Sequence, residues 1–214
     1  MECIRKKLGC GNYVSEVYSP PKIVTVAQAA GLRGGFSLDL TAPDPNGQVW
    51  DFAKRSCREK ARQLMRLQKP YLLIGSPPCT AWSNLQNLNK CRPGGKERVA
   101  EQQRRARVHL LFCTSLYFEQ MAAGRYFLHD HPQSAASWQD KCMMELEAHP
   151  MVFETYIDQC AYGLKSKDEV GGAPAKKPTK FLTNSVAIGN ELGKRCPGCA
   201  RHVHLVEGRA RDAQ

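Results

Sequence analysis

Residues 71–83, YLLIGSPPCTAWS, decide the expected fold of this chain of 214 residues. Residues 71–74 form a continuous apolar run, which is typical of a buried parallel strand. Two prolines then stiffen the backbone immediately before Cys79. The stiff turn, directly after a buried strand, fixes the orientation of the Cys79 thiol. We therefore expect a functional cysteine at the carboxyl end of a sheet, with a buried cysteine of no special function as the alternative.

Short β-rich runs alternate with helical patterns on both sides of this segment. Strands are expected at residues 13–18, 36–40, 125–128 and 154–160, and helices at residues 23–30, 57–68 and 96–122. Residues 84–95 and 164–178 are expected to be loops, and residues 181–183 and 202–206 a late hairpin. The alternation predicts one α/β domain over residues 1–214, a Rossmann-like, doubly wound and mostly parallel sheet.

Polar sequences follow the expected strands repeatedly: SPPK, LDLT, SPPCT and HDHP. In a doubly wound sheet, ligands bind beyond the carboxyl ends of the strands. These four sequences are therefore expected to meet in one site.

The composition indicates a globular protein with an anionic partner. The chain has 31 Lys+Arg against 20 Asp+Glu, a formal charge of +11, and 42% hydrophobic residues. Such a surplus favours binding to nucleic acid or to an anionic membrane surface. Two basic runs, residues 54–69 and 90–107, flank the Cys79 turn. They favour phosphate contacts, with solvated helix faces as the alternative.

The apolar runs, the first ten residues and the cysteines indicate where the protein is expected to be located. No apolar run is long enough to span a bilayer, and the first ten residues do not resemble a secretory leader. We therefore expect an intracellular protein without a membrane partner, nuclear if eukaryotic, whose ten cysteines are thiols. The oligomeric state is open.

GSPPCTAWS, residues 75–83, resembles the nucleophile motif of the DNA cytosine-5 methyltransferases, a Gly-x-Pro-Cys turn after a strand. The order of the other motifs resembles that family over residues 13–205, and KPTKFLTN with the closing Cys/His cluster is similar to compact phage and retroelement forms. The resemblance implies an S-adenosylmethionine-dependent methyltransferase fold and methyl transfer to cytosine C5 in DNA. It implies Cys79 as the nucleophile, and Asp130 of FLHDHP in the place of the family's catalytic Glu.

The resemblance also implies contacts for the cofactor and the base. S-adenosylmethionine would meet Asp39 at its ribose, Asp51 at its adenine and Pro77 in the cysteine turn. Tyr18 and Ser19 stand where the family has a Phe-x-Gly-x-Gly loop, from which this sequence departs. The implied substrate-binding residues are Trp82, Ser83, His129, His131 and Gln159. A core anchor for the tryptophan and loop capping for the two histidines are the alternatives.

The chemistry explains why these residue types are needed. Cytosine C5 does not attack a methyl sulfonium unaided, but addition of a thiolate at C6 generates an enamine-like carbon at C5. A carboxyl group near N3 stabilises the charge that develops during this addition. Because the base must leave the helical stack to reach the thiol, the enzyme also needs a basic surface that holds the backbone.

A second cluster, within residues 193–206, has the composition of a small zinc site. Cys196 and Cys199 form a Cys-x2-Cys clip, and His202 and His204 follow closely. The alternative is a turn of inert thiols.

Two other functions remain open. A non-catalytic nucleic-acid-binding module, part of a retroelement polyprotein, is favoured by the missing glycine loop and by aspartate in place of glutamate. A thiol or zinc redox protein is permitted by the ten cysteines. The sequence does not indicate DNA as opposed to RNA, or a target sequence.

Overall fold

The computed structural model describes residues 14–168, 170–198, 201–203 and 205. Their centre is a six-stranded sheet of order β2-β1-β3-β4-β8-β5. The strands are β1 (Val14–Val17), β2 (Gly34–Leu38), β3 (Leu72–Gly75), β4 (Tyr126–Pro132), β5 (Phe153–Asp158) and β8 (Pro178–Thr183). The first four pair in parallel, and β8 is antiparallel to both β4 and β5. The predicted α/β class with a mostly parallel sheet is confirmed.

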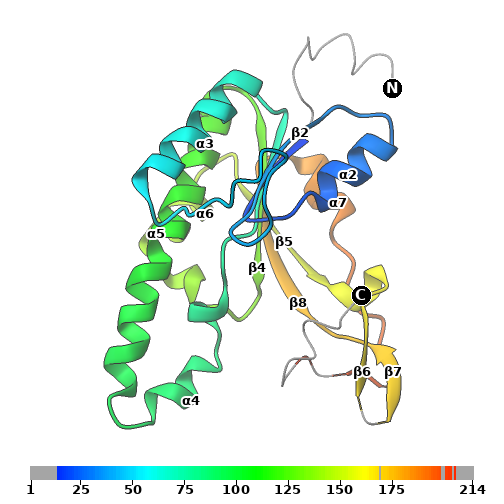
Figure 1. The fold of residues 1–214 in the computed structure, drawn as a ribbon. Coiled ribbons are helices and arrows are strands. Elements are labelled where there is room, and N and C mark those ends of the chain that lie inside the picture. Colours follow the sequence, from blue (N-terminus) through cyan, green and yellow to red (C-terminus); the bar gives the residue numbers. More distant parts are fainter. Residues whose placement is uncertain (1–13, 169, 199–200, 204, 206–214) are drawn as a thin grey trace.

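Helices cover both faces of this sheet (Figure 1). On one face lie α2 (Lys22–Ala29) and α7 (Val186–Glu191), and on the other lie α3 (Arg55–Gln68), α5 (Gly95–Ala122) and α6 (Lys141–Glu147). The larger core cluster lies on the α3–α5–α6 side, where residues such as Met65, Leu110 and Leu146 are buried. A smaller cluster, including Val24 and Ile74, fills the space under α2. The sheet is therefore doubly wound, with unequal cores on its two faces.

Two further elements extend from the body of the domain. α4 (Gln86–Lys90) lies against the beginning of the long α5, and the hairpin of β6 (Lys165–Asp168) and β7 (Gly171–Pro174) projects on the other side (Figure 1). Gly95 makes the first contact possible, because a Cβ there would lie 1.9 Å from the carbonyl oxygen of Asn89. Only glycine allows that approach.

Several expected boundaries differ from the structure. β4 extends through His129, Asp130 and His131 to Pro132, so HDHP is the end of a strand and not a loop. Residues 84–95 contain α4, and residues 164–178 contain the β6–β7 hairpin. α6 and α7 were not predicted.

The expected pairing of residues 181–183 with residues 202–206 is wrong. Both edges of β8 are occupied, by β4 and by β5, so no further strand can pair with it. Val203 instead makes a parallel bridge to Ala175, beside the β6–β7 hairpin. Local apolar patterning could not show this, because either partner buries the same side chain.

No helix among the residues that the structure describes is both long and apolar enough to cross a membrane.

Candidate active site

The order of the strands places a crevice between the carboxyl ends of β1 and β3. From β1 the chain crosses to β2 on one side, and from β2 it returns to β3 on the other side of β1. Such a reversal opens a crevice in which doubly wound proteins bind ligands. Ser76 N–H donates to the carbonyl oxygen of Val17 at 3.2 Å, which joins the two strand ends. The turn that carries Cys79 begins at this point.

His131, on β4, fastens the proline–cysteine turn to the sheet. Its Nε2 lies 2.8 Å from the carbonyl oxygen of Pro77, and its Nδ1 lies 2.7 Å from Ser137 Oγ. Because a carbonyl oxygen only accepts, Nε2 carries the proton and Ser137 donates to Nδ1. Burial lowers the pKa of His131, which favours this neutral form. The residue therefore holds the Cys79 turn in a fixed position.

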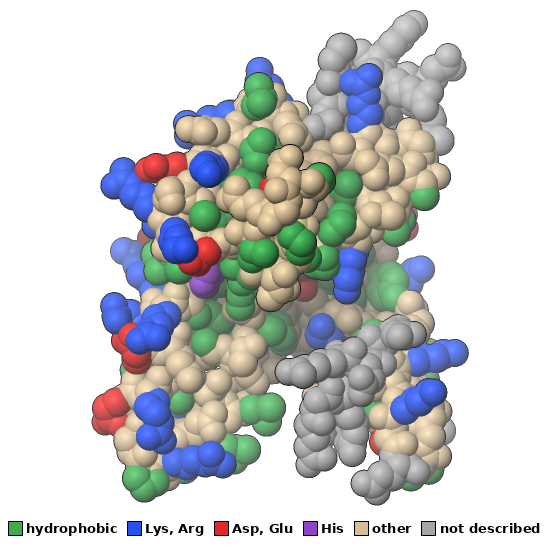
Figure 2. All heavy atoms as spheres, in the orientation of Figure 1, with side chains coloured by type: hydrophobic (Ala, Val, Ile, Leu, Met, Phe, Trp, Pro, Cys, Tyr) green, Lys and Arg blue, Asp and Glu red, His purple; other side chains and the backbone are tan. Residues whose placement is uncertain are grey.

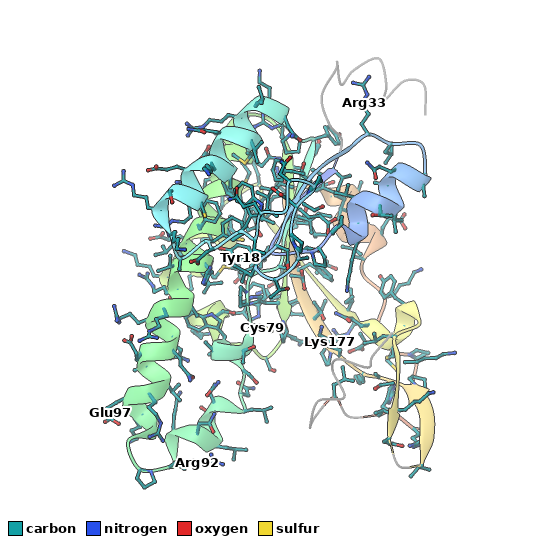
Figure 3. All side chains as sticks on the ribbon, viewed as in Figure 1. Tyr18, Arg33, Cys79, Arg92, Glu97 and Lys177 are labelled. Carbon is teal, nitrogen blue, oxygen red and sulfur yellow. The ribbon has the colours of Figure 1, made fainter. Side chains whose placement is uncertain are left out.

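The Cys79 side chain is half-buried at the start of a short 3-10 helix, Thr80–Trp82. The carbonyl oxygen of Cys79 accepts from Trp82 N–H at 2.9 Å. Burial raises the pKa of the Cys79 thiol, and the charge of Lys177 lowers it in opposition. In Figure 3, Cys79 and Lys177 come from different parts of the fold, the turn after β3 and the loop between β7 and β8. Lys177 is thus the cation that favours the thiolate.

Asp130, on β4, lies beside the same strand end. It accepts a hydrogen bond from the Ser76 hydroxyl, and its negative charge adds to the raised pKa of Cys79. The parallel register of β3 and β4, in which Gly75 lies opposite His129, brings the two residues together. The structure thus places both predicted catalytic residues in one region.

A cavity of ≈ 890 Å³ opens next to Asp130, on the face of the sheet between α2 and α7. Its lining includes the polar side chains of Ser19, Ser76 and Gln159. Its apolar lining includes Ile74, Leu128, Phe181 and Ile188. This volume is within the usual range for small-molecule sites, about 300–1,000 Å³, and an apolar lining with a few polar groups is typical of them.

Tyr18 adopts a left-handed backbone, with φ of 60°, directly after β1. Glycine takes this conformation without strain, and most other residues avoid it. The Tyr18 side chain is buried toward α5, where its hydroxyl lies 3.0 Å from His109 Nδ1 and its ring lies 4.6 Å from that of Phe52. Ser19 Oγ donates to Glu16 Oε2 at 2.7 Å.

Asp39 and Asp51 follow β2 and bind their own loops. Asp39 Oδ1 accepts from Thr41 N–H, Thr41 Oγ1 and Ala42 N–H at 2.7–2.8 Å. Burial raises the pKa of Asp39, but these hydrogen bonds outweigh burial and leave the pKa lowered. Asp51 Oδ1 accepts from Ala53 N–H at 3.1 Å. Burial lowers the pKa of His109, and the charge of Asp51 opposes this effect without reversing it. Neither carboxylate lines the 890 Å³ cavity.

Three residues predicted to contact the substrate are buried. Trp82 is 6% exposed, and its Nε1 has no hydrogen-bond partner among the described residues. His129 is fully buried, with Nδ1 3.0 Å from the Tyr117 hydroxyl, and His131 is 1% exposed. Their burial fits a core and positioning role and does not fit direct contact with a base. Ser83 accepts from Leu85 N–H at 3.2 Å and remains partly exposed.

Two of the four predicted metal ligands, Cys196 and His202, lie within the described residues. Cys196 Sγ lies 3.3 Å from His202 Nε2, and Cys160 completes a group whose ligand atoms are all within 4.8 Å of one another. Cys199 and His204 lie outside the described residues. Cys160 was not predicted as a ligand, because nothing in its local sequence indicates that it lies near Cys196 and His202.

Other residues missed by the sequence are Glu16 and Lys177. Glu16 is fully buried in β1, where Oε1 accepts from Val24 N–H at 2.7 Å, and it lines the cavity. An acid at the centre of an apolar strand is the signal that could have indicated it. Lys177 lies in a Lys-rich loop whose position only the fold reveals.

Some cations of the two basic runs form ion pairs with acidic side chains, and others do not. In α3 and α5, for example, Arg62 and Arg66 pair with Glu119, and Arg104 and Arg105 pair with Glu101. Around α4 and the first turns of α5, the exposed residues Arg92, Lys96 and Arg98 have no ion pair among the described residues. Figure 2 shows basic side chains at this end of the molecule, beside a hollow in its face. Arg92 is labelled there in Figure 3.

A scan against protein-family models and a search of curated proteins found no match for this chain.

Proposed function

We propose that this protein is a reduced DNA cytosine-5 methyltransferase that forms a covalent adduct between Cys79 and cytosine. The observation that carries the proposal is the fastening of the Cys79 turn by His131, next to Asp130. A positioned thiol with a carboxylate on the neighbouring strand is what addition across the C5–C6 bond of cytosine requires.

The residues take separate parts in this chemistry. Lys177 stabilises the thiolate of Cys79, which adds to C6 and leaves a nucleophilic C5. Asp130, oriented by the Ser76 hydroxyl, gives a proton to N3 as the thiolate adds, which neutralises the negative charge that develops there, and takes the proton back when Cys79 leaves. After methylation of C5, loss of the C5 proton to a base restores the double bond and expels Cys79. S-adenosylmethionine, when bound, supplies the electrophilic methyl group.

The 890 Å³ cavity is a better candidate site for a nucleoside cofactor than the loops that carry Asp39 and Asp51. Its apolar lining suits the faces of an adenine ring, and Ser19, Ser76 and Asp130 in the same lining offer hydrogen bonds. The left-handed Tyr18 supports the same reading, because it provides the turn for which a glycine is normally used. Ser19 and Ser76 would hold the cofactor beside the Cys79 turn.

Transfer of tritiated methyl groups from S-adenosylmethionine to DNA tests the proposal. We expect incorporation at cytosine C5, and a loss of at least about 1,000-fold with Cys79→Ala, since the covalent route is then closed. Cys91→Ala, at an exposed cysteine beside α4, is the matched control and should retain activity. Incorporation that survives Cys79→Ala would contradict the proposal.

A non-catalytic nucleic-acid-binding module is the second candidate. Burial raises the pKa of Cys79, and an ordinary thiol at neutral pH is a weaker nucleophile than a thiolate. The unpaired cations around α4 would serve such a module equally well. Tight binding to DNA without any binding of S-adenosylmethionine, measured by calorimetry, would favour this candidate.

A further inference from the structure

We propose that Cys160, Cys196 and His202 bind a structural zinc ion. The ion would join Cys196 and His202 to Cys160 at the end of β5. This site is independent of the methyltransferase proposal. It differs from the sequence prediction by including Cys160, which comes from another part of the chain.

The positions of the three ligand atoms suit three corners of a tetrahedral metal site. In a tetrahedral zinc site with bonds of about 2.0–2.3 Å, ligand atoms are separated by about 3.3–3.8 Å. Cys196 Sγ and His202 Nε2 lie 3.3 Å apart, and all three ligand atoms lie within 4.8 Å of one another. Shifts of about 1 Å or less would therefore close the group around an ion.

The ligand chemistry favours zinc over calcium or magnesium. Two thiolates and an imidazole are soft or borderline ligands, whereas calcium and magnesium take oxygen ligands. Both thiols lose their protons to solvent when the ion binds, and the histidine binds in its neutral form.

Local backbone contacts hold two of the ligands in place. Cys196 N–H donates to Asp158 Oδ2 at 2.9 Å, and Asp158 N–H donates to the carbonyl oxygen of Lys194 at 3.2 Å. Cys160 lies in the 3-10 helix Gln159–Tyr162, which continues directly from β5. The end of β5 thus supplies one thiol and positions the other.

The third ligand is held from the opposite side. Val203, next to His202, is 1% exposed, and its N–H donates to the carbonyl oxygen of Pro174 at 2.9 Å. Arg201 pairs with Asp168 in β6. Lys194 therefore contacts β5 and Val203 contacts the β6–β7 hairpin, and Cys196 and His202 lie next to these two contacts.

This part of the protein has little apolar core of its own. Of the described residues in 159–177, only Ser166 and Ala175 are buried. A two-stranded hairpin such as β6–β7 is marginally stable alone. Small units with insufficient core are commonly stabilised by a metal, whose binding free energy then contributes to folding. A zinc ion would perform that task here.

Metal analysis of protein purified under reducing conditions tests the site. We expect about one zinc ion per chain in the native protein and less than about 0.2 in Cys160→Ser. Cys91→Ser is the matched control, since Cys91 is exposed at the end of α4, and it should keep its zinc. Full zinc in Cys160→Ser would overturn the ligand set.

Cobalt titration keeps the test valid if Cys160→Ser fails to fold. Metal-depleted native protein should bind Co²⁺ with tetrahedral d–d bands and a thiolate-to-metal charge-transfer band. Cys160→His, which retains a ligand, should still bind Co²⁺ with a weaker charge-transfer band. Folded protein that binds neither metal, or a Cys160–Cys196 disulfide in the reduced preparation, would overturn the proposal.

Discussion

His131 Nε2 donates a hydrogen bond to the carbonyl oxygen of Pro77 at 2.8 Å, across the boundary between β4 and the cysteine turn. This contact relates two motifs that are far apart in the sequence, SPPCT and HDHP. It gives the second histidine of HDHP a positioning role, and it leaves Asp130, between the two histidines, beside the turn. The arrangement leads to predictions about the turn, the thiol, the cavity and the basic surface.

Removing the His131 side chain should lower kcat with little change in KM. His131→Ala frees the Pro77 carbonyl, and a displacement of the nucleophile by about 1 Å can cost about 100-fold in rate. The free energy of unfolding should fall by about 2 kcal/mol, because a buried carbonyl loses its donor. Steady-state methyl transfer and urea unfolding measure the two effects.

His131→Gln separates positioning from stability, because its amide can still donate near the former Nε2. We expect it to recover most of the rate. His149→Ala, at a histidine near the end of α6, is the control and should leave kcat unchanged. Equal loss of kcat in the alanine and glutamine variants would contradict the positioning role.

Lys177→Ala should make Cys79 less reactive at a given pH. The lysine charge lowers the pKa of Cys79, so its removal raises that pKa further above the ordinary value of 9.0. At about pH 8 the thiolate fraction, and with it the alkylation rate, should fall roughly two- to fivefold. Iodoacetamide labelling of the Cys79 peptide, followed by mass spectrometry across pH, measures this shift.

Lys176→Ala is the matched control, since Lys176 is the exposed neighbour in the same loop and no described interaction relates it to Cys79. Its pH profile should follow that of the native protein. Identical profiles for the Lys177 and Lys176 variants would show that Lys177 does not act on the thiol.

Filling the 890 Å³ cavity should prevent binding of S-adenosylmethionine. Ile188 of α7 lines the cavity, and Ile188→Trp places a large ring inside it. We expect the affinity to fall by at least about 30-fold, or about 2 kcal/mol, by calorimetry. Val186→Trp, on the same helix but 55% exposed and not in the lining, should bind normally. Normal binding by Ile188→Trp would exclude this cavity as the cofactor site.

The unpaired cations at the α4–α5 end should contact DNA phosphates. Arg92→Ala with Arg98→Ala should reduce the slope of log K against log[salt] by about 1.8, since each phosphate contact contributes about 0.9. Arg104→Ala with Arg105→Ala removes the same charge from two residues that pair with Glu101, and should change the slope less. Fluorescence anisotropy at several salt concentrations measures both. Equal slopes in the two double variants would show that this end does not bind the backbone.

The sequence was sufficient for strands β1, β2 and β3 and for placing Cys79 and Asp130 at neighbouring strand ends. Two β-rich runs and the apolar run at residues 71–74 identified β1, β2 and β3, and the parallel register then brought Cys79 and Asp130 together. The end of β4 was missed because His129, Asp130 and His131 are polar. Their burial depends on partners such as Tyr117 and Ser137, which lie on other elements.

Contacts between segments far apart in the chain could not be predicted from the sequence. Cys160 meets Cys196 only because β5 pairs with β8 and the following chain returns past Asp158. The insertion of β8 between β4 and β5 likewise depends on the packing of both faces of the sheet and has no local signal. The implied contacts of Asp39 and Asp51 with a cofactor remain predictions.

Trapping on DNA that contains 5-fluorocytosine tests the central claim most directly. Fluorine at C5 cannot leave as a proton, so the adduct between Cys79 and C6 should persist after methyl transfer. With S-adenosylmethionine present, we predict a denaturation-resistant protein–DNA complex whose cross-linked peptide contains Cys79, and none with Cys79→Ser. If the native protein binds this DNA and the cofactor yet forms no such complex, the covalent mechanism is contradicted.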